Sequence, residues 1–336
     1  MIKRLILAFV LIAGGAIAIS ANWAWRTLNV ALDIPGEGVF YTVRSGASLA
    51  SVTADLARQG ILSHPRVVNW YARVDGSATG IKAGEYKLVP GLTPLSLLEQ
   101  FGRGDVFLHQ FTIVEGWRFD EMLARLRANE AVRAGIENGD EIMGLLGSEG
   151  ISPEGQFLPD TYSFPRDSRD IEILRTAHNA LDAALETAWN DRVDDNVLGT
   201  PYEGLILASI IEKETALADE RALISGVFHE RLQRNMRLQT DPSVIYGLGR
   251  AFDGNLTRVQ LLTDTPYNTY TRAGLPPTPI ALPGRASIVA AFSPRLSGAL
   301  YFVATGDPDG SHTFSSTLEE HNAAVRRYLD KQNGRD

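Results

Sequence analysis

Two glutamates stand close together at the end of a long apolar stretch, in the sequence Glu212-Lys213-Glu214. A buried carboxyl group has a raised pKa and can serve as a general acid near neutral pH, so this placement could support proton-transfer chemistry. In a helix, Glu214 would share a face with the apolar residues three, four and seven positions before it, whereas Glu212 would point nearly the opposite way. The two therefore cannot flank one bond, and Glu214 is the candidate acid. The alternative is the plain end of a helix that reaches the surface.

The residues before Glu214 predict the helix that would position it. Thr200 can cap its start, Pro201 occupies the first helical position, and Glu203 completes a capping box. From Gly204 onward the stretch is almost wholly apolar, which predicts a helix that is buried on most sides. The expected element is a core helix that carries a carboxyl group to its end.

Other kinds of catalytic site are absent from the sequence. Because the chain has no cysteine, disulfides and thiolate metal sites are excluded. The motifs H-E-x-x-H, G-x-S-x-G and S-x-x-K do not occur, and the histidines show no metal-ligand spacing, so we expect no metal and no cofactor. Gly247-Leu248-Gly249 lacks the third glycine of a dinucleotide-binding loop. Carboxylate chemistry is what remains.

The N-terminus predicts a membrane anchor. After two basic residues, an apolar run covers residues 5–25, which is long enough to span a bilayer core of about 30 Å. The positive-inside rule places residues 1–4 in the cytoplasm and everything after Arg26 outside, and two tryptophans near the end of the run suit an interfacial aromatic belt. The alternative is a cleaved signal peptide with Ala16-Ile17-Ala18 as its cleavage site. In both cases the bulk of the chain is exported.

Length and charge limit what the exported part can be. A chain of 336 residues is long enough for two domains, and 44% hydrophobic with 21% charged residues is an ordinary globular composition. The formal net charge is −8 and no basic block occurs, which argues against nucleic acid as a partner.

The segment 38–104 predicts a small module. A strand at 38–43, helices at 49–59 and 65–74, and a second strand at 84–88 give the order strand, helix, helix, strand. This order resembles a LysM module, a type that binds polymers containing N-acetylglucosamine. The alternative is a small α+β domain without a ligand.

The following residues predict a larger domain of mixed helices and strands. A strand is expected at 106–114 and a charged surface helix at 130–150. The loop 152–165 carries two acids and is either a structural bracket or the wall of a cleft. The loop 264–280 is long for a compact domain, and its two tyrosines and one asparagine suit contacts with sugars. The expected fold class is α+β, with a cytoplasmic stub (1–4), a transmembrane helix (5–25), a linker (26–37), a LysM-like βααβ module (38–104), a catalytic domain (105–330) and a tail (331–336).

A series of motifs resembles the MltG (YceG-like) endolytic murein transglycosylases. The motifs occur in the family's order and cover essentially the whole chain, which makes the resemblance specific, although 130–150 is the least recognisable segment. They are Val114-Glu115-Gly116, Pro159-Asp160-Thr161-Tyr162, Ala208-Ser209-Ile210-Ile211-Glu212-Lys213-Glu214-Thr215, Met236-Arg237-Leu238-Gln239-Thr240-Asp241-Pro242-Ser243-Val244-Ile245-Tyr246-Gly247, Tyr267-Asn268-Thr269-Tyr270, Gly274-Leu275-Pro276-Pro277, Ile280-Ala281-Leu282-Pro283-Gly284, Tyr301-Phe302-Val303-Ala304 and His312-Thr313-Phe314.

The resemblance implies a single-pass enzyme of the inner membrane whose catalytic domain lies in the periplasm. It implies cleavage of the MurNAc–GlcNAc β-1,4 bond within nascent glycan strands, which leaves 1,6-anhydro-MurNAc ends and terminates strand elongation. The family's catalytic glutamate is the second one of E-K-E, here Glu214. The implied partners are peptidoglycan strands and the inner membrane, with peptidoglycan synthases as further candidates.

One carboxyl group can serve such a reaction, whereas ordinary glycosidases use two. Protonated Glu214 would donate to the leaving GlcNAc oxygen, and the MurNAc acetamide could stabilise the oxocarbenium-like centre. Ionised Glu214 would then accept the proton of the C6 hydroxyl as that oxygen attacks C1. For each candidate sugar contact, the alternative is a hydrogen bond that only stabilises a loop. These candidates are Gln239, Asp241, Tyr267, Asn268 and Tyr270.

Two other functions remain open from the sequence. One is a non-catalytic, membrane-anchored scaffold that binds peptidoglycan. The other is a muramidase that uses Asp241 as a second carboxylate and adds water to the cleaved bond.

Overall fold

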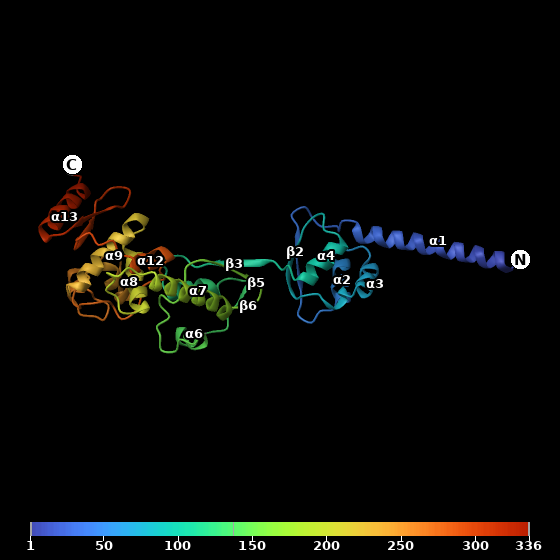
Figure 1. The fold of residues 1–336 in the computed structure, drawn as a ribbon, viewed down its shortest axis with the longest axis horizontal. Coiled ribbons are helices and arrows are strands. Elements are labelled where there is room, and N and C mark those ends of the chain that lie inside the picture. Colours follow the sequence, from blue (N-terminus) through green and yellow to red (C-terminus); the bar gives the residue numbers. More distant parts are fainter. Residues whose placement is uncertain (1, 137, 335–336) are drawn as a thin grey trace. The chain divides into compact units, whose positions relative to one another are not determined.

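The computed structural model describes residues 2–136 and 138–334. Residue 1 of the predicted stub and residues 335–336 of the predicted tail lie outside the described residues. The fold is mixed α+β with a long apolar helix at the N-terminus, as predicted (Figure 1).

The chain forms two compact units, which we call unit 1 and unit 2. Unit 1 comprises Met1–His109 and Ser163–Asp167, and unit 2 comprises Gln110–Tyr162 and Ser168–Asp336. Each unit has a hydrophobic core of its own.

Unit 1 contains the predicted order of strand, helix, helix and strand. Strands β1 and β2 pair antiparallel, with Val39 opposite Leu88 and Val43 opposite Gly84. The order of these elements is therefore confirmed, whereas a glycan ligand for the module stays a prediction. The elements are α1 (Ile2–Asn29), β1 (Val39–Val43), α2 (Leu49–Arg58), α3 (Pro65–Asp75), η1 (Ser77–Thr79), β2 (Gly84–Leu88) and α4 (Pro94–Arg103).

The core of unit 1 joins the sheet, its helices and the chain that leaves α1. Tyr86 and Phe101 are fully buried, and their rings meet edge to face with centroids 4.7 Å apart. Leu28, Leu32 and Ile34 enter the same core. The end of α1 is thereby packed into unit 1.

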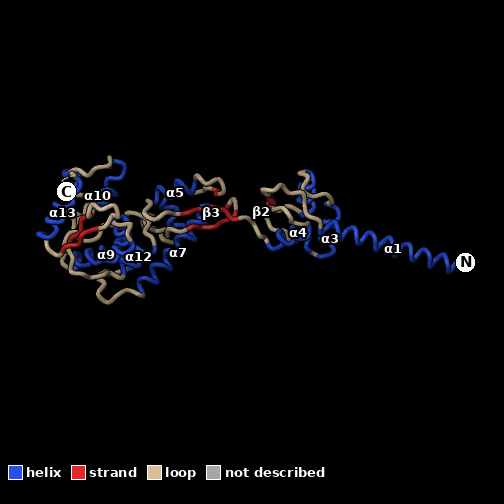
Figure 2. The backbone as a smooth tube through the Cα atoms, turned by 90° about the horizontal axis from the view of Figure 1, so that it is seen from above, coloured by secondary structure: helices blue, strands red, loops and turns tan. Residues whose placement is uncertain are grey.

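The strands of unit 2 form short pairs, drawn in red in Figure 2. Strands β4 and β6 pair in parallel, and β7 pairs antiparallel with β8. Strand β3 pairs with β5, and the division between the units falls within both of these strands. The elements are β3 (Leu108–Thr112), α5 (Phe119–Arg127), β4 (Val132–Arg133), α6 (Gly139–Leu146), β5 (Thr161–Pro165), β6 (Ser168–Arg169), α7 (Asp170–Asn190), α8 (Pro201–Glu214), α9 (Ala218–Gln233), α10 (Asp241–Leu248), η2 (Gly249–Ala251), α11 (Arg258–Leu262), α12 (Arg285–Phe292), β7 (Tyr301–Ala304), β8 (His312–Ser315) and α13 (Leu318–Gln332).

Helix α8 lies in the core of unit 2, as its apolar sequence predicts, and every residue from Gly204 to Ile211 is buried. Thr200 caps the helix by accepting a hydrogen bond from Glu203 N at 3.2 Å. The other half of the predicted capping box differs, because the Glu203 carboxylate accepts from Gly199 N at 2.6 Å. A Cβ at Gly204 would stand 1.9 Å from the ring of Phe292, so glycine is what lets α12 approach this closely.

The segment 130–150 differs from the predicted surface helix. Among its described residues, helix is confined to α6, where Ile142 and Met143 are fully buried. The chain before α6 is held by Asp170, whose carboxylate accepts from Gly135 N at 2.9 Å and Ile136 N at 3.2 Å. The many charged residues of the segment led to the prediction of a solvent-exposed helix. The structure instead has a short helix whose apolar residues contribute to the core.

Candidate active site at the end of helix α8

Helix α8 ends at Glu214, because the next residue, Thr215, is extended with φ −147° and ψ 139°. Protein atoms surround the Glu214 carboxyl group, although the residue as a whole is only half-buried. Burial raises the pKa of Glu214 to about 7, since the ionised form loses its hydration there. The negative charge of Asp241 raises this pKa further, whereas a hydrogen bond from Thr240 and the charge of Arg231 lower it.

A network of hydroxyl groups orients the Glu214 carboxyl group. Thr240 Oγ1 donates a hydrogen bond to Glu214 Oε1. Thr240 is itself fixed, because its N–H donates to Thr269 Oγ1 at 3.0 Å and its carbonyl accepts from Ser243 Oγ at 2.9 Å. All three hydroxyl residues are buried. The orientation of the carboxyl group therefore depends on the start of α10 and on the loop 264–280.

Glu212 bonds to a different part of unit 2, in line with the helical geometry. It accepts hydrogen bonds from Gly284 N at 3.0 Å and Ser287 Oγ at 2.6 Å. A Cβ at Gly284 would stand 1.9 Å from Glu115 Oε1, so only glycine fits between these groups. Burial and the charge of Glu212 raise the pKa of Glu115. Glu212 thus ties α8 to the start of α12, while Glu214 faces Thr240.

Arg231 of α9 is a buried cation that the sequence analysis did not single out. Its side chain is held by Leu300 O at 2.7 Å from Nε, and by Leu238 O at 2.7 Å and Gln239 Oε1 at 3.3 Å from Nη1. Its positive charge lowers the pKa of Glu214, and burial lowers its own pKa. A signal was present in the sequence, because Arg231 follows Phe228 by three residues and so shares its apolar face.

Three of the five predicted sugar contacts lie beside Thr240. Gln239 and Asp241 are exposed on either side of it along the chain. Gln239 has a left-handed backbone with φ +51°, which non-glycine residues seldom adopt and which is common at functional sites. Tyr270 is half-buried, and its hydroxyl donates to Asp241 Oδ1 at 2.5 Å. An amide, a carboxylate and a phenol thus surround the threonine that contacts Glu214.

The other two predicted contacts lie further inside the loop. The Tyr267 hydroxyl bonds with Thr278 Oγ1 at 2.8 Å, and its ring meets Tyr246 edge to face at 4.9 Å. Asn268 is 1% exposed, and its amide group donates to the carbonyls of Gln260, Leu261 and Thr263 at 2.7–3.2 Å. The contacts of Asn268 are those of a residue that holds the loop in shape.

A second carboxyl group in unit 2 also has a strongly raised pKa. Glu154, in the loop 152–165, is 5% exposed, and burial raises its pKa to about 7. Its Oε1 accepts a hydrogen bond from Phe119 N at 3.0 Å, and Tyr246 bonds to the same carboxyl group. These contacts join the loop to the start of α5. They favour a structural role for this loop over the wall of a cleft.

The arrangement around Glu214 can transfer a proton. A carboxyl group with a pKa near 7 is partly protonated at neutral pH, so it can donate a proton and take one back. Its neighbours present hydroxyl, amide and carboxylate groups, which suit a polyhydroxylated ligand. Within residues 2–136 and 138–334, no group of three or more His, Asp or Glu side chains is placed to hold a metal ion.

Comparison with known proteins gives a consistent set of relatives. The YceG-like family matches residues 41–327. A Bacillus subtilis protein named endolytic murein transglycosylase is 29% identical over 311 residues, which cover 87% of this chain and 85% of that protein. A Streptococcus pneumoniae protein of the same name is 24% identical over 331 residues, which cover 86% of this chain and 58% of that protein. The crystal structure of a YceG-like protein from Listeria monocytogenes aligns with a TM-score of 0.55 and 28% identity, and the alignment covers 86% of this chain and 99% of that one.

Proposed function

The chain belongs to the YceG-like family, and we propose that it is an endolytic lytic transglycosylase of peptidoglycan with Glu214 as its acid and base. The observation that carries the proposal is the carboxyl group of Glu214, a half-buried residue at the end of a core helix, whose pKa burial raises to about 7. The names of the relatives from Bacillus subtilis and Streptococcus pneumoniae support the substrate class.

In the proposed reaction, Glu214 acts twice within one catalytic cycle. Its neutral carboxyl group protonates the GlcNAc oxygen as the β-1,4 bond to MurNAc breaks. The carboxylate then accepts the proton of the MurNAc C6 hydroxyl while that oxygen bonds to C1, which closes the 1,6-anhydro ring. No water is consumed, and Glu214 returns to its protonated state. Cleavage within a nascent strand would end its elongation.

The neighbours of Glu214 have distinct parts in this proposal. Thr240 stabilises the ionised form through its donated hydrogen bond, while Asp241 disfavours that form by charge repulsion. Burial is the main reason that the pKa is raised to about 7, and these two neighbours adjust it in opposite directions. A pKa near neutrality suits a group that both donates and accepts a proton. Gln239 and Tyr270 would hydrogen-bond the sugar in this proposal, with Tyr267 as a further candidate.

We also propose that α1 anchors the protein in the inner membrane, with the chain that follows Arg26 in the periplasm. The helix is long and apolar enough to cross a bilayer. None of the residues in its apolar 18-residue stretch is buried inside the protein. Two basic residues at its start support the orientation. Under this proposal the LysM-like part of unit 1 is a candidate glycan-binding module, and peptidoglycan synthases are candidate partners.

One observation favours a second candidate function. Asp241 lies close enough to Glu214 to raise its pKa, so a second carboxylate is present near the proposed acid. A muramidase would use such a carboxylate to activate water and would release a reducing MurNAc end. The hydrogen bond from Tyr270 occupies one oxygen of Asp241, which favours a positioning role over that of a base.

Glu214→Gln tests the proposal against the non-catalytic scaffold. The variant and the wild type are incubated with purified glycan strands, and both the released fragments and strand binding by co-sedimentation are measured. The expected result is loss of 1,6-anhydro products with binding retained. Full activity of the variant would refute the proposed role of Glu214, and a wild-type protein that binds strands without cleaving them would support the scaffold.

A further inference from the structure

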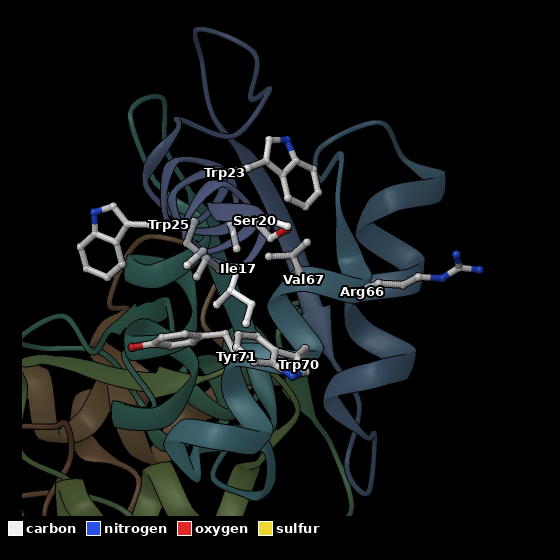
Figure 3. A pocket seen from close by; sticks show the side chains of 12 residues that line it. Ile17, Ser20, Trp23, Trp25, Arg66, Val67, Trp70 and Tyr71 are labelled. Atoms are coloured by element: carbon white, nitrogen blue, oxygen red, sulfur yellow. The ribbon is translucent and has the colours of Figure 1, made fainter. Parts of the chain in front are cut away.

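A groove of about 710 Å³ lies between α1 and α3 in unit 1 (Figure 3). Ile17, Ser20 and Ala24 contribute to the wall on α1, and Val67 and Tyr71 contribute to the wall on α3. Figure 3 shows Ile17 and Ser20 of α1 beside Val67 and Tyr71 of α3. Trp23, Trp25, Trp70 and Arg66 also line the groove, so its walls are mostly apolar, with one arginine at the edge.

The outer surface of α3 continues the apolar character of this groove. Helix α3 buries its opposite face in the core of unit 1. Trp70, which also lines the groove, and Val74 are 60% and 71% exposed. Arg66 and Arg73 are also exposed, and at 100° per residue they fall together along one edge of the apolar stripe. Exposed tryptophan and valine flanked by arginines are typical of helices that lie in a membrane interface.

The distance along α1 from its cytoplasmic end places this groove within the hydrocarbon layer of the bilayer. Ile17 follows Leu5 by twelve residues, which is about 18 Å at 1.5 Å per residue, while the hydrocarbon core is about 30 Å thick. With Leu5 at the cytoplasmic boundary, the wall at Ile17 therefore lies inside the outer half of the bilayer. A shift of the span toward the N-terminus would draw Lys3 and Arg4 into hydrocarbon, which is unfavourable.

We propose that α3 is a second membrane contact of this protein and lies in the outer interfacial layer of the bilayer that α1 crosses. Acyl chains of phospholipids fill the groove, Trp70 and Val74 enter the apolar layer, and Arg66 and Arg73 reach lipid phosphates. The inference rests on the proposed anchor. Two contacts restrict rotation of the βααβ module about α1 and fix the height of this module relative to the membrane.

Lipid fits the groove better than a protein partner. One wall is a stretch of α1 that must itself be surrounded by lipid if α1 is an anchor. The exposed arginines of α3 complement anionic lipid headgroups. One apolar surface therefore continues from α1 to α3, and lipid surrounds the α1 part of this surface if α1 is an anchor.

Single cysteines test the proposal in the full chain, because the natural sequence contains none. Val74→Cys reports on α3, and Leu11→Cys reports on the anchor. The matched control is Arg58→Cys on α2, where the side chain is 77% exposed and lines a polar depression that shares no residue with the groove. Each variant is labelled with a polarity-sensitive fluorophore and reconstituted in nanodiscs whose lipids carry a quencher at a shallow or a deep acyl position.

The expected result is a blue-shifted label at position 74 that loses intensity with the shallow quencher. The label at position 11 should lose intensity with the deep quencher, and the label at position 58 with neither. If position 74 behaves like position 58 while position 11 is quenched, the inference is overturned and the anchor stands. Protection of position 74 from an aqueous quencher without lipid quenching would also overturn it, in favour of a protein partner. If position 11 escapes quenching, the anchor itself is wrong and the inference falls with it.

Discussion

Glu154 and Glu214 are two carboxyl groups of unit 2 whose pKa burial raises to about 7, yet their surroundings differ. Glu154 is 5% exposed and accepts a hydrogen bond from a backbone N–H, so it joins two segments of the chain. Glu214 accepts from the hydroxyl of Thr240 and keeps part of its surface accessible. A raised pKa therefore marks burial in both cases, whereas accessibility to a ligand distinguishes a candidate acid from a structural one.

The largest expected effect comes from removing the ionisable group at each position. Glu214→Gln should lower kcat for strand cleavage by about a thousandfold, because general acid–base catalysis contributes roughly 10²–10⁴. Glu154→Gln should lower it less than about tenfold, because an amide can still accept the hydrogen bond from Phe119 N. Initial rates of fragment release measure both. Equal losses in the two variants would remove the distinction drawn between these carboxyl groups.

Both groups should also make stability depend on pH, with the same sign. Their pKa values are raised on folding from 4.5 to about 7, so the stability that they contribute is fully present below pH 4.5 and is lost as the pH rises through 7. Between pH 5 and pH 8 the loss should be about 2–3 kcal/mol for each group. Thermal unfolding at pH 5 and pH 8 measures it, and each glutamine variant should show a smaller decline than the wild type. An unchanged decline would show that the group is ionised or exposed in the folded protein.

Helix α8 and its terminal glutamate could be predicted from the sequence because both follow from local patterns. Capping residues, an unbroken apolar run and the angle between helical positions depend on residues close together in the chain. The partners of Glu214 could not be predicted this way, since Thr240 and Arg231 reach it through loops and helices that only the folded chain brings together. In the sequence, Glu154 is one of two acids in the loop 152–165, and its burial depends on α5 and Tyr246.

The hydrogen bond from Thr240 gives a prediction that separates the two groups. Thr240→Val removes the donor that stabilises ionised Glu214, so the pKa of Glu214 should rise and the alkaline limb of kcat/KM should move to higher pH, by about one unit or less. The pH profile of strand cleavage measures this shift. The pH dependence attributed to Glu154 should not change. A limb that stays in place would indicate that another group controls the profile.

Asp241→Asn should produce the opposite and smaller shift. Loss of a nearby negative charge makes ionisation of Glu214 easier, so the alkaline limb should move to lower pH. The variant should keep its anhydro products, because Asp241 does not activate water in the proposed mechanism. A variant that binds strands normally but loses cleavage altogether would favour the muramidase alternative.

The most direct test of the central claim is the origin of the oxygen at the new glycan end. Purified strands are digested by the wild-type protein in water enriched in heavy oxygen, and the fragments are weighed by mass spectrometry. The account predicts MurNAc ends that contain no solvent oxygen and are lighter by one water than hydrolysis products, and these ends should be missing with Glu214→Gln. Heavy oxygen at the new MurNAc ends would contradict it and would show that the protein hydrolyses the bond.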